Sequence, residues 1–95
     1  MRPDHGGRLE LKLTQASAER ARYALTIFLP EREVTTEALV ETASGTLELG
    51  AWQGQPPPAW LETVARALLR TMWRSATSDG DWPRRVTRWR PEPKS

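Results

Sequence analysis

The sequence predicts an α+β domain in which a four-stranded antiparallel β-meander is packed on one face by a helix at about residues 58–78. Two observations predict this class. Apolar and polar residues alternate through four segments between residues 8 and 52, which is the period of half-buried strands. From residue 59 the apolar residues recur every three to four positions, which is the period of an amphipathic helix. Ninety-five residues are enough for one such domain with one core.

The four strands are expected at residues 8–14, 20–29, 34–42 and 46–52. A four-residue loop that begins with proline separates the second strand from the third, and a Ser-Gly pair marks a tight turn before the fourth. In each strand every second residue is expected to face the core. These inward residues are Leu9, Leu11, Leu13, Tyr23, Leu25, Ile27, Leu29, Val34, Thr36, Ala38, Val40, Leu47, Leu49 and Ala51.

The requirement that inward residues pair with inward residues predicts a register. It places Leu29 opposite Val34, and it places Arg22 opposite Glu41 as an exposed pair of opposite charge. The same register places Glu41 opposite Glu48, which is unfavourable unless Arg22 lies close to both. A slip by one residue would turn a whole strand inside out, so the agreement between the faces supports the meander.

The helix is expected to follow the proline run at 56–58, whose last proline suits the first helical position. The alternative interpretation of this run is a polyproline recognition segment. The glycine of the pair at 79–80 suits the end of the helix. With Leu68 at its centre, the apolar arc of this helix is Leu61, Val64, Ala65, Leu68, Leu69, Met72 and Ala76.

Residues 81–90 fit a short C-terminal helix or an extended segment. As a helix, the segment would place Trp82, Val86 and Trp89 on one face, whereas both faces of a strand would mix arginine with tryptophan. We therefore favour the helix. Whether Trp82 and Trp89 belong to the core or bind a partner stays open at this point.

The expected organisation is a flexible N-terminal arm at 1–7, a single domain at 8–90 and a flexible tail at 91–95. No stretch has the length and apolarity of a secretion signal or a membrane span, so we expect a cytoplasmic protein. Twelve of the fourteen basic residues are arginine, which we interpret as the codon usage of a GC-rich, bacterial-like genome.

The residues for catalysis are few. The chain has no cysteine, and its single histidine, His5, lies beside two glycines in the predicted arm. This composition argues against nucleophilic triads and against zinc sites built from cysteine or histidine. The glycines do not form a phosphate-binding loop. We therefore predict a protein that is not an enzyme and that has no cofactor, no metal site and no catalytic residue.

Charge divides the chain unevenly. Residues 1–65 contain six basic and nine acidic groups, whereas residues 66–95 contain eight basic and three acidic groups. Within the first part, residues 31–65 contain six glutamates and one arginine. An asymmetry of this kind is typical of a protein with a face for an anionic partner.

The hypothesis from the sequence is a small non-catalytic interaction module. It would bind an acidic protein surface, or a second copy of itself, through the basic C-terminal third. The alternative is a nucleic-acid-binding domain that uses the same side chains, because arginine contacts phosphate and tryptophan stacks on bases. The candidate partner-binding residues are Arg66, Arg70, Trp73, Arg74, Arg84, Arg85, Arg88 and Arg90.

Overall fold

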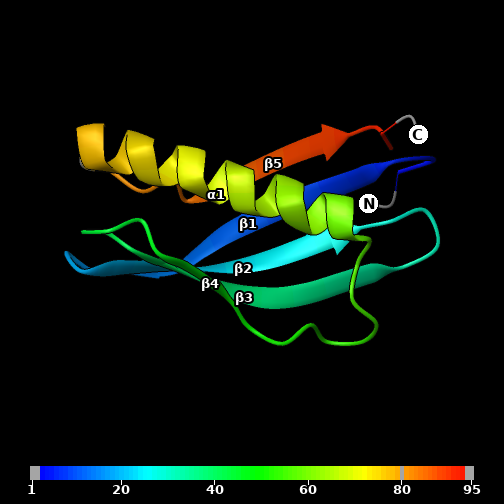
Figure 1. The fold of residues 1–95 in the computed structure, drawn as a ribbon, viewed down its shortest axis with the longest axis horizontal. Helices are drawn as coiled ribbons and strands as arrows, with labels where there is room; N and C mark the ends of the chain where they lie inside the picture. The colour runs from blue at the N-terminus through cyan, green and yellow to red at the C-terminus, as the bar shows by residue number, and fades with distance from the viewer. Residues whose placement is uncertain (1–2, 80, 94–95) are drawn as a thin grey trace.

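The computed structural model describes residues 3–79 and 81–93 (Figure 1). A five-stranded antiparallel sheet forms one layer and a single long helix forms the other. The elements in chain order are β1 (Gly7–Ala16), β2 (Arg20–Phe28), β3 (Glu33–Glu41), β4 (Leu47–Leu49), α1 (Ala59–Asp79) and β5 (Arg85–Arg90). The predicted α+β class, with a meander followed by a packed helix, is confirmed.

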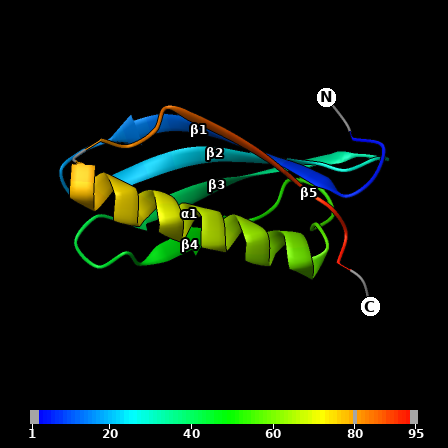
Figure 2. The same ribbon diagram turned by 90° about the horizontal axis from the view of Figure 1, so that it is seen from above.

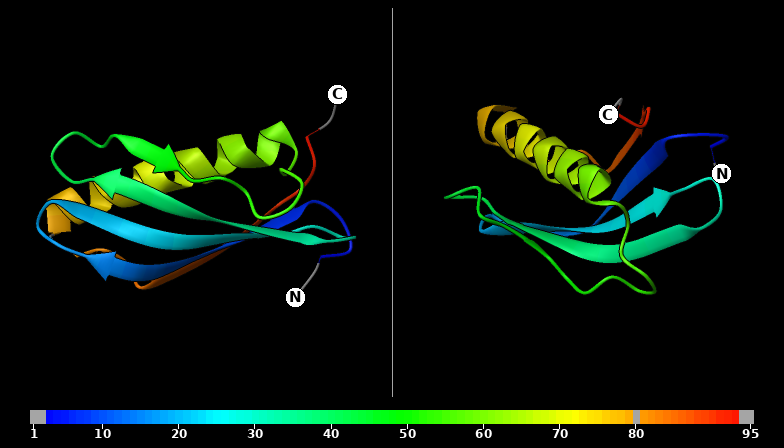
Figure 3. Two further views of the ribbon diagram at one scale, coloured as in Figure 1. Left: turned by 90° about the horizontal axis from the view of Figure 1, so that it is seen from below. Right: turned by 45° about the vertical axis from the view of Figure 1, so that its right-hand side comes forward.

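The strands lie in the order β4-β3-β2-β1-β5, so the chain builds four neighbours in turn and then returns to the far edge. Helix α1 makes this return by running along one face of the sheet (Figure 2). Figure 3 shows that the opposite face is covered by none of the described elements. The two edges of the sheet are therefore β4 and β5.

The preference for a C-terminal helix is wrong, because residues 85–90 form strand β5. This strand pairs antiparallel with β1 from Gly7 opposite Arg90 to Lys12 opposite Arg85. In a four-stranded meander β1 would be an edge with unpaired backbone groups, and β5 satisfies these groups. Val86 lies opposite the buried Leu11 and adds one apolar side chain under the helix.

The register between β2 and β3 differs from the predicted one by two residues. Ile27, rather than Leu29, lies opposite Val34, and Arg22 lies opposite Leu39 rather than Glu41. The loop has two residues, 30 and 31, instead of the expected four, because the Leu29 amide donates to the carbonyl of residue 32 at 2.7 Å. A shift of two residues keeps every side chain on its predicted face, so the core is the same in both registers.

The register between β3 and β4 is also shifted by two. Glu48 lies opposite Leu39, and Val40 lies opposite Leu47, so the predicted pairing of Glu41 with Glu48 does not form. The Glu41 amide instead donates to the carbonyl of the residue that precedes β4. The fourth strand is shorter than expected, although the chain beyond it still follows β3 and forms an isolated bridge at Gln53.

The core lies between the sheet and one stripe of α1. Leu61, Ala65 and Leu69 are completely buried on this stripe, whereas Leu68 is only partly buried. The centre of the apolar arc is therefore Leu69, and the placement of Leu68 at the centre is wrong. The buried sheet residues are Leu9, Leu11, Ala21, Tyr23, Leu25, Ile27, Leu29, Val34, Thr36, Ala38 and Val40.

Tryptophans attach the helix and its flanking segments to this core. Trp73 donates from Nε1 to the carbonyl of Thr42 at 2.7 Å and holds α1 against the turn between β3 and β4. Its ring lies so close to Gly45 that a Cβ atom at that position would come within 2.9 Å of it. Gly45 also has φ 75°, so this turn requires glycine for two reasons. Trp82 packs edge-on against Tyr23, with ring centroids 6.2 Å apart.

Candidate functional site

Strand β5 is one of the two edges of the sheet. The Leu13 amide donates to the Arg84 carbonyl at 2.8 Å, so Arg84 and every second residue after it bond to β1 through their backbone. Because bonded and non-bonded positions alternate in an antiparallel ladder, the backbone groups of Arg85, Thr87 and Trp89 point away from β1. No described strand pairs with β5 on that side. These three residues therefore form a free edge.

Two arginine side chains cover carbonyl oxygens on this free edge. Arg88 donates from Nη1 to the Thr87 carbonyl at 2.8 Å, and Arg90 donates from Nη1 to the Trp89 carbonyl at 2.9 Å. Both arginines are exposed. Charged side chains on an edge strand discourage uncontrolled pairing with other strands. The covering bonds come from long side chains, so they are easily exchanged for bonds to a ligand.

A shallow hollow of about 340 Å³ lies between β5 and α1. The anchor of α1 lies towards the other edge of the sheet, where Trp73 bonds to the turn between β3 and β4. The helix wall of the hollow is mostly apolar and its strand wall is cationic. The lining residues are Val64, Ala67, Leu68, Thr71, Arg88 and Arg90.

The arginines of β5 differ in their electrostatic environment. Arg85 points to the outer face of the sheet and forms a 2.7 Å ion pair with Glu10. A hydrogen bond from Arg85 is the main reason that the pKa of Glu10 lies below its usual value. Arg88 and Arg90 take part in none of the ion pairs between described side chains. Their positive charges are therefore available to a ligand.

Trp89 lies on the opposite side of β5 from these two arginines. It pairs with Arg8, on the face that α1 does not cover, and 43% of it is exposed. Its Nε1 donates to the His5 carbonyl at 3.0 Å, and the two rings meet edge-on with centroids 5.2 Å apart. Trp89 is thus the exposed tryptophan, whereas Trp82 packs on the core.

The structure separates the arginines that the sequence groups together. Arg66, Arg70 and Arg74 are exposed on α1 and line none of the hollows described here, and Trp73 serves packing. Arg84 is exposed directly before β5. Arg88 and Arg90 are the two predicted residues that come together at a cavity. Arg85 is close in sequence but is paired on the other face.

The apolar wall of the hollow and the exposed edge at Thr87 could not be identified as a site from the sequence. The spacing of Val64, Ala67, Leu68 and Thr71 places them on one side of the helix, and this spacing is the signal that could have identified them. This spacing was not sufficient alone, because the sequence predicts that Val64 and Leu68 belong to the buried arc of the helix, with Leu68 at its centre. Only the pairing of β5 with β1 places arginines beside them.

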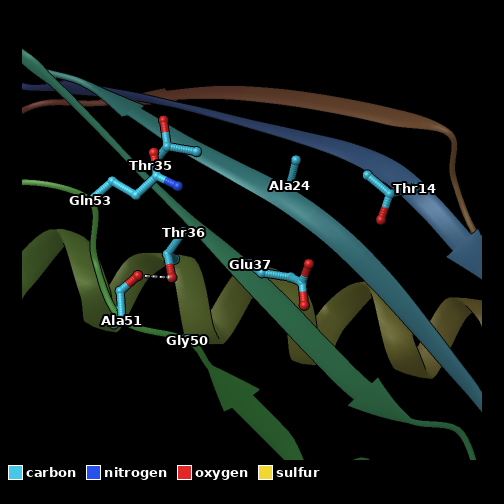
Figure 4. Close-up of a pocket in the computed structure, with 8 residues that line it drawn as sticks. All are labelled: Thr14, Ala24, Thr35, Thr36, Glu37, Gly50, Ala51 and Gln53. Atoms are coloured by element: carbon cyan, nitrogen blue, oxygen red, sulfur yellow. Dashed lines mark hydrogen bonds between the residues drawn. The ribbon is translucent and has the colours of Figure 1, made fainter.

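A second hollow, of about 360 Å³, lies along β3 (Figure 4). Its Thr36 hydroxyl donates to the Ala51 carbonyl at 3.0 Å, and this bond fastens the chain after β4 to the sheet. Its ionisable lining residue is Glu37, whose carboxylate lies 3.4 Å from the Arg22 Nε. These groups already serve the fold, so the hollow beside β5 is the stronger candidate site. The lining residues are Thr14, Ala24, Thr35, Thr36, Glu37, Gly50, Ala51 and Gln53.

Within residues 3–79 and 81–93, no three histidine, aspartate or glutamate side chains are grouped closely enough to hold a metal ion. In the same part of the chain, α1 is not apolar enough to cross a membrane. Comparison with protein-family models, with curated proteins and with solved structures gives no match for this chain.

Proposed function

We propose that this protein is a non-catalytic interaction module that binds an acidic segment of a partner protein at β5 and the hollow beside it. The observation that carries the proposal is the pair Arg88 and Arg90. Both are exposed, neither is paired with a carboxylate among the described residues, and both line a cavity with an apolar wall. Unpaired cations beside apolar surface suit a ligand with carboxylates and aliphatic groups.

The placement of Trp89 favours a protein partner over nucleic acid. A single-stranded nucleic acid site combines phosphate contacts with bases stacked on aromatic rings. Trp89 faces the outer side of the sheet, whereas Arg88 and Arg90 face the helix side. A base stacked on Trp89 would meet Arg8 directly opposite and Arg85 on the same strand, whose charge is already compensated by Glu10. The two unpaired arginines of β5 would lie on the other face of the sheet, out of line with the stacked base.

The charges of β5 also disfavour self-association through this strand. Antiparallel pairing of two β5 strands would bring arginine side chains of one copy against those of the other, and like charges on neighbouring strands are destabilising. We therefore assign the site to an acidic segment of a different protein.

The test uses a fluorescent peptide with the sequence Ser-Glu-Val-Glu-Val-Leu-Ser and measures its anisotropy at low salt. The double variant Arg88→Glu/Arg90→Glu should bind the peptide at least about ten-fold more weakly, which corresponds to ~1.4 kcal/mol. The matched control is Arg66→Glu/Arg70→Glu, which changes the net charge equally on a part of α1 that does not line the hollow. The control should bind like the wild type.

A single-stranded oligothymidylate provides the competing arm. If wild-type protein binds it with an affinity that falls steeply with salt, and ignores the peptide, then the nucleic-acid alternative replaces the proposal. Equal loss of peptide binding in both double variants would mean that net charge, rather than the β5 site, attracts the peptide.

A further inference from the structure

We propose that the partner segment binds by adding a sixth strand to the free edge of β5. This inference rests on the proposed function and specifies how the same site recognises its ligand. Its basis is the row of backbone groups at Arg85, Thr87 and Trp89, which points away from β1 and meets no described strand. An extended peptide can satisfy such a row with main-chain hydrogen bonds.

The arginine bonds on this edge make the exchange favourable for an acidic ligand in particular. The carbonyls of Thr87 and Trp89 are covered by guanidinium groups from the next residue along the strand. An incoming strand supplies amide donors to these carbonyls and so releases both guanidiniums. The released groups then lie beside the new strand, where carboxylates accept stronger hydrogen bonds than carbonyls do. A neutral or basic strand would release the arginines without offering them a partner.

The alternation of β5 predicts the side-chain pattern of the ligand. Residues directly opposite each other on neighbouring strands share a face, so ligand residues opposite Arg88 and Arg90 lie on the helix side, next to the hollow. These two positions are separated by one residue and should be acidic. The next helix-side position lies opposite Val86 and should be apolar. The intervening residues lie on the outer face, where Thr87 and Trp89 adjoin them.

This pattern defines the orientation of the probe. In an antiparallel sixth strand, the first glutamate of Ser-Glu-Val-Glu-Val-Leu-Ser lies opposite Arg90, the second opposite Arg88, and the leucine opposite Val86. The valines then lie opposite Thr87 and Trp89, and it is their backbone groups that exchange hydrogen bonds with β5. The amides of the glutamates point away from the protein.

Backbone methylation of the peptide tests the inference directly. Methylation of the two valine nitrogens removes donors to the Thr87 and Trp89 carbonyls and should weaken binding about ten-fold or more. The matched control peptide is methylated on its two glutamate nitrogens and should keep most of its affinity, because those nitrogens make no bond to the protein. A peptide in which both glutamates are replaced by glutamine should bind weakly.

Amide hydrogen exchange gives a second readout in the protein. Bound peptide should slow exchange at Arg85, Thr87 and Trp89. Val86 and Arg88 already bond to β1 and should change little, so they act as internal controls. If the peptide binds but valine methylation and edge-amide exchange have no effect, strand addition is refuted while the proposed function stands. A wild-type protein that ignores the peptide overturns both, and the arginines then only protect the edge.

Discussion

Replacement of Leu69 and Leu68 by alanine, one at a time, tests how the helix is oriented on the sheet. The two substitutions remove the same atoms from neighbouring positions of α1, so they have the same effect on helix propensity. Leu69 is completely buried, whereas Leu68 is partly exposed at the hollow beside β5. The difference between the two variants therefore reports burial alone.

The expected magnitudes follow from the burial of each side chain. Leu69→Ala loses three buried carbon groups at ~0.8 kcal/mol each, and the residual cavity raises the cost to ~2–5 kcal/mol. This is a large part of the ~5–15 kcal/mol that stabilises a typical domain. Leu68→Ala removes a side chain that is only partly buried, and water from the hollow can fill the space that it leaves. We therefore expect a loss of roughly 1 kcal/mol in the free energy of unfolding.

Urea titration followed by tryptophan fluorescence measures both variants. With an m value of about 1–3 kcal/mol per molar, a loss of ~2–5 kcal/mol should lower the unfolding midpoint of Leu69→Ala by about 0.7–5 M. Leu68→Ala should lower it by a clearly smaller amount. Leu68→Ala should in turn weaken peptide binding, which Leu69→Ala should affect only through stability. Equal midpoints for the two variants, or a lower midpoint for Leu68→Ala, would refute the orientation of α1.

Three further predictions test individual contacts. Tyr23 donates from its hydroxyl to a proline carbonyl before β5 at 2.7 Å, and burial raises its pKa to about 12. Because an unfolded tyrosine ionises near pH ~10, wild-type stability should fall as the pH rises from about 10 to 12. Tyr23→Phe should abolish that fall. At neutral pH the same substitution should cost ~1–3 kcal/mol of stability. As the sole tyrosine, its titration can be followed by absorbance, and ionisation near pH 10 in the folded protein would contradict the prediction. Arg22 and Glu37 should show a coupling of only ~0.2–1 kcal/mol in a double-mutant cycle, because both side chains are substantially exposed; a larger coupling would require a buried pair. Gly45→Ala should be more destabilising than Gly54→Ala in thermal unfolding, since both positions have positive φ but a Cβ atom at Gly54 would meet nothing within 4 Å; equal losses would exclude a steric role for the indole beside Gly45.

The strands of the meander and the helix could be predicted because their apolar periods are long and unbroken. The register between strands could not be predicted, because an alternating pattern places the same side chains on the same face after a shift of two residues. The observed register depends on long-range contacts. Arg32 donates to the carbonyls of Gln55 and Pro56, at 2.7 and 3.0 Å, and so ties the β2–β3 loop to a segment more than 20 residues away. No local pattern in the loop contains this information.

Strand β5 shows the opposite difficulty, because its local pattern is misleading. Its inner face carries Val86 followed by Arg88 and Arg90, so it lacks the alternation of a half-buried strand. The edge strand tolerates these arginines on its inner face, because the hollow between β5 and α1 lets them reach solvent. The basic composition of the C-terminal third was therefore readable in the sequence, whereas the division of its arginines between helix and strand faces was not.

The pairing of β5 with β1 has a consequence for folding and opening. It joins residues 7–12 to residues 85–90, almost the two ends of the chain, whereas β1 to β4 pair with sequence neighbours. Long-range pairing is slow to form because the intervening chain must be ordered first, so we expect β5 to dock last, onto a preformed meander and helix. The same strand should be the first part of the sheet to detach in the native protein, which native-state hydrogen exchange can measure. A ligand bound to β5 would then stabilise the pairing of β5 with β1 and would slow the separation of the two ends of the chain.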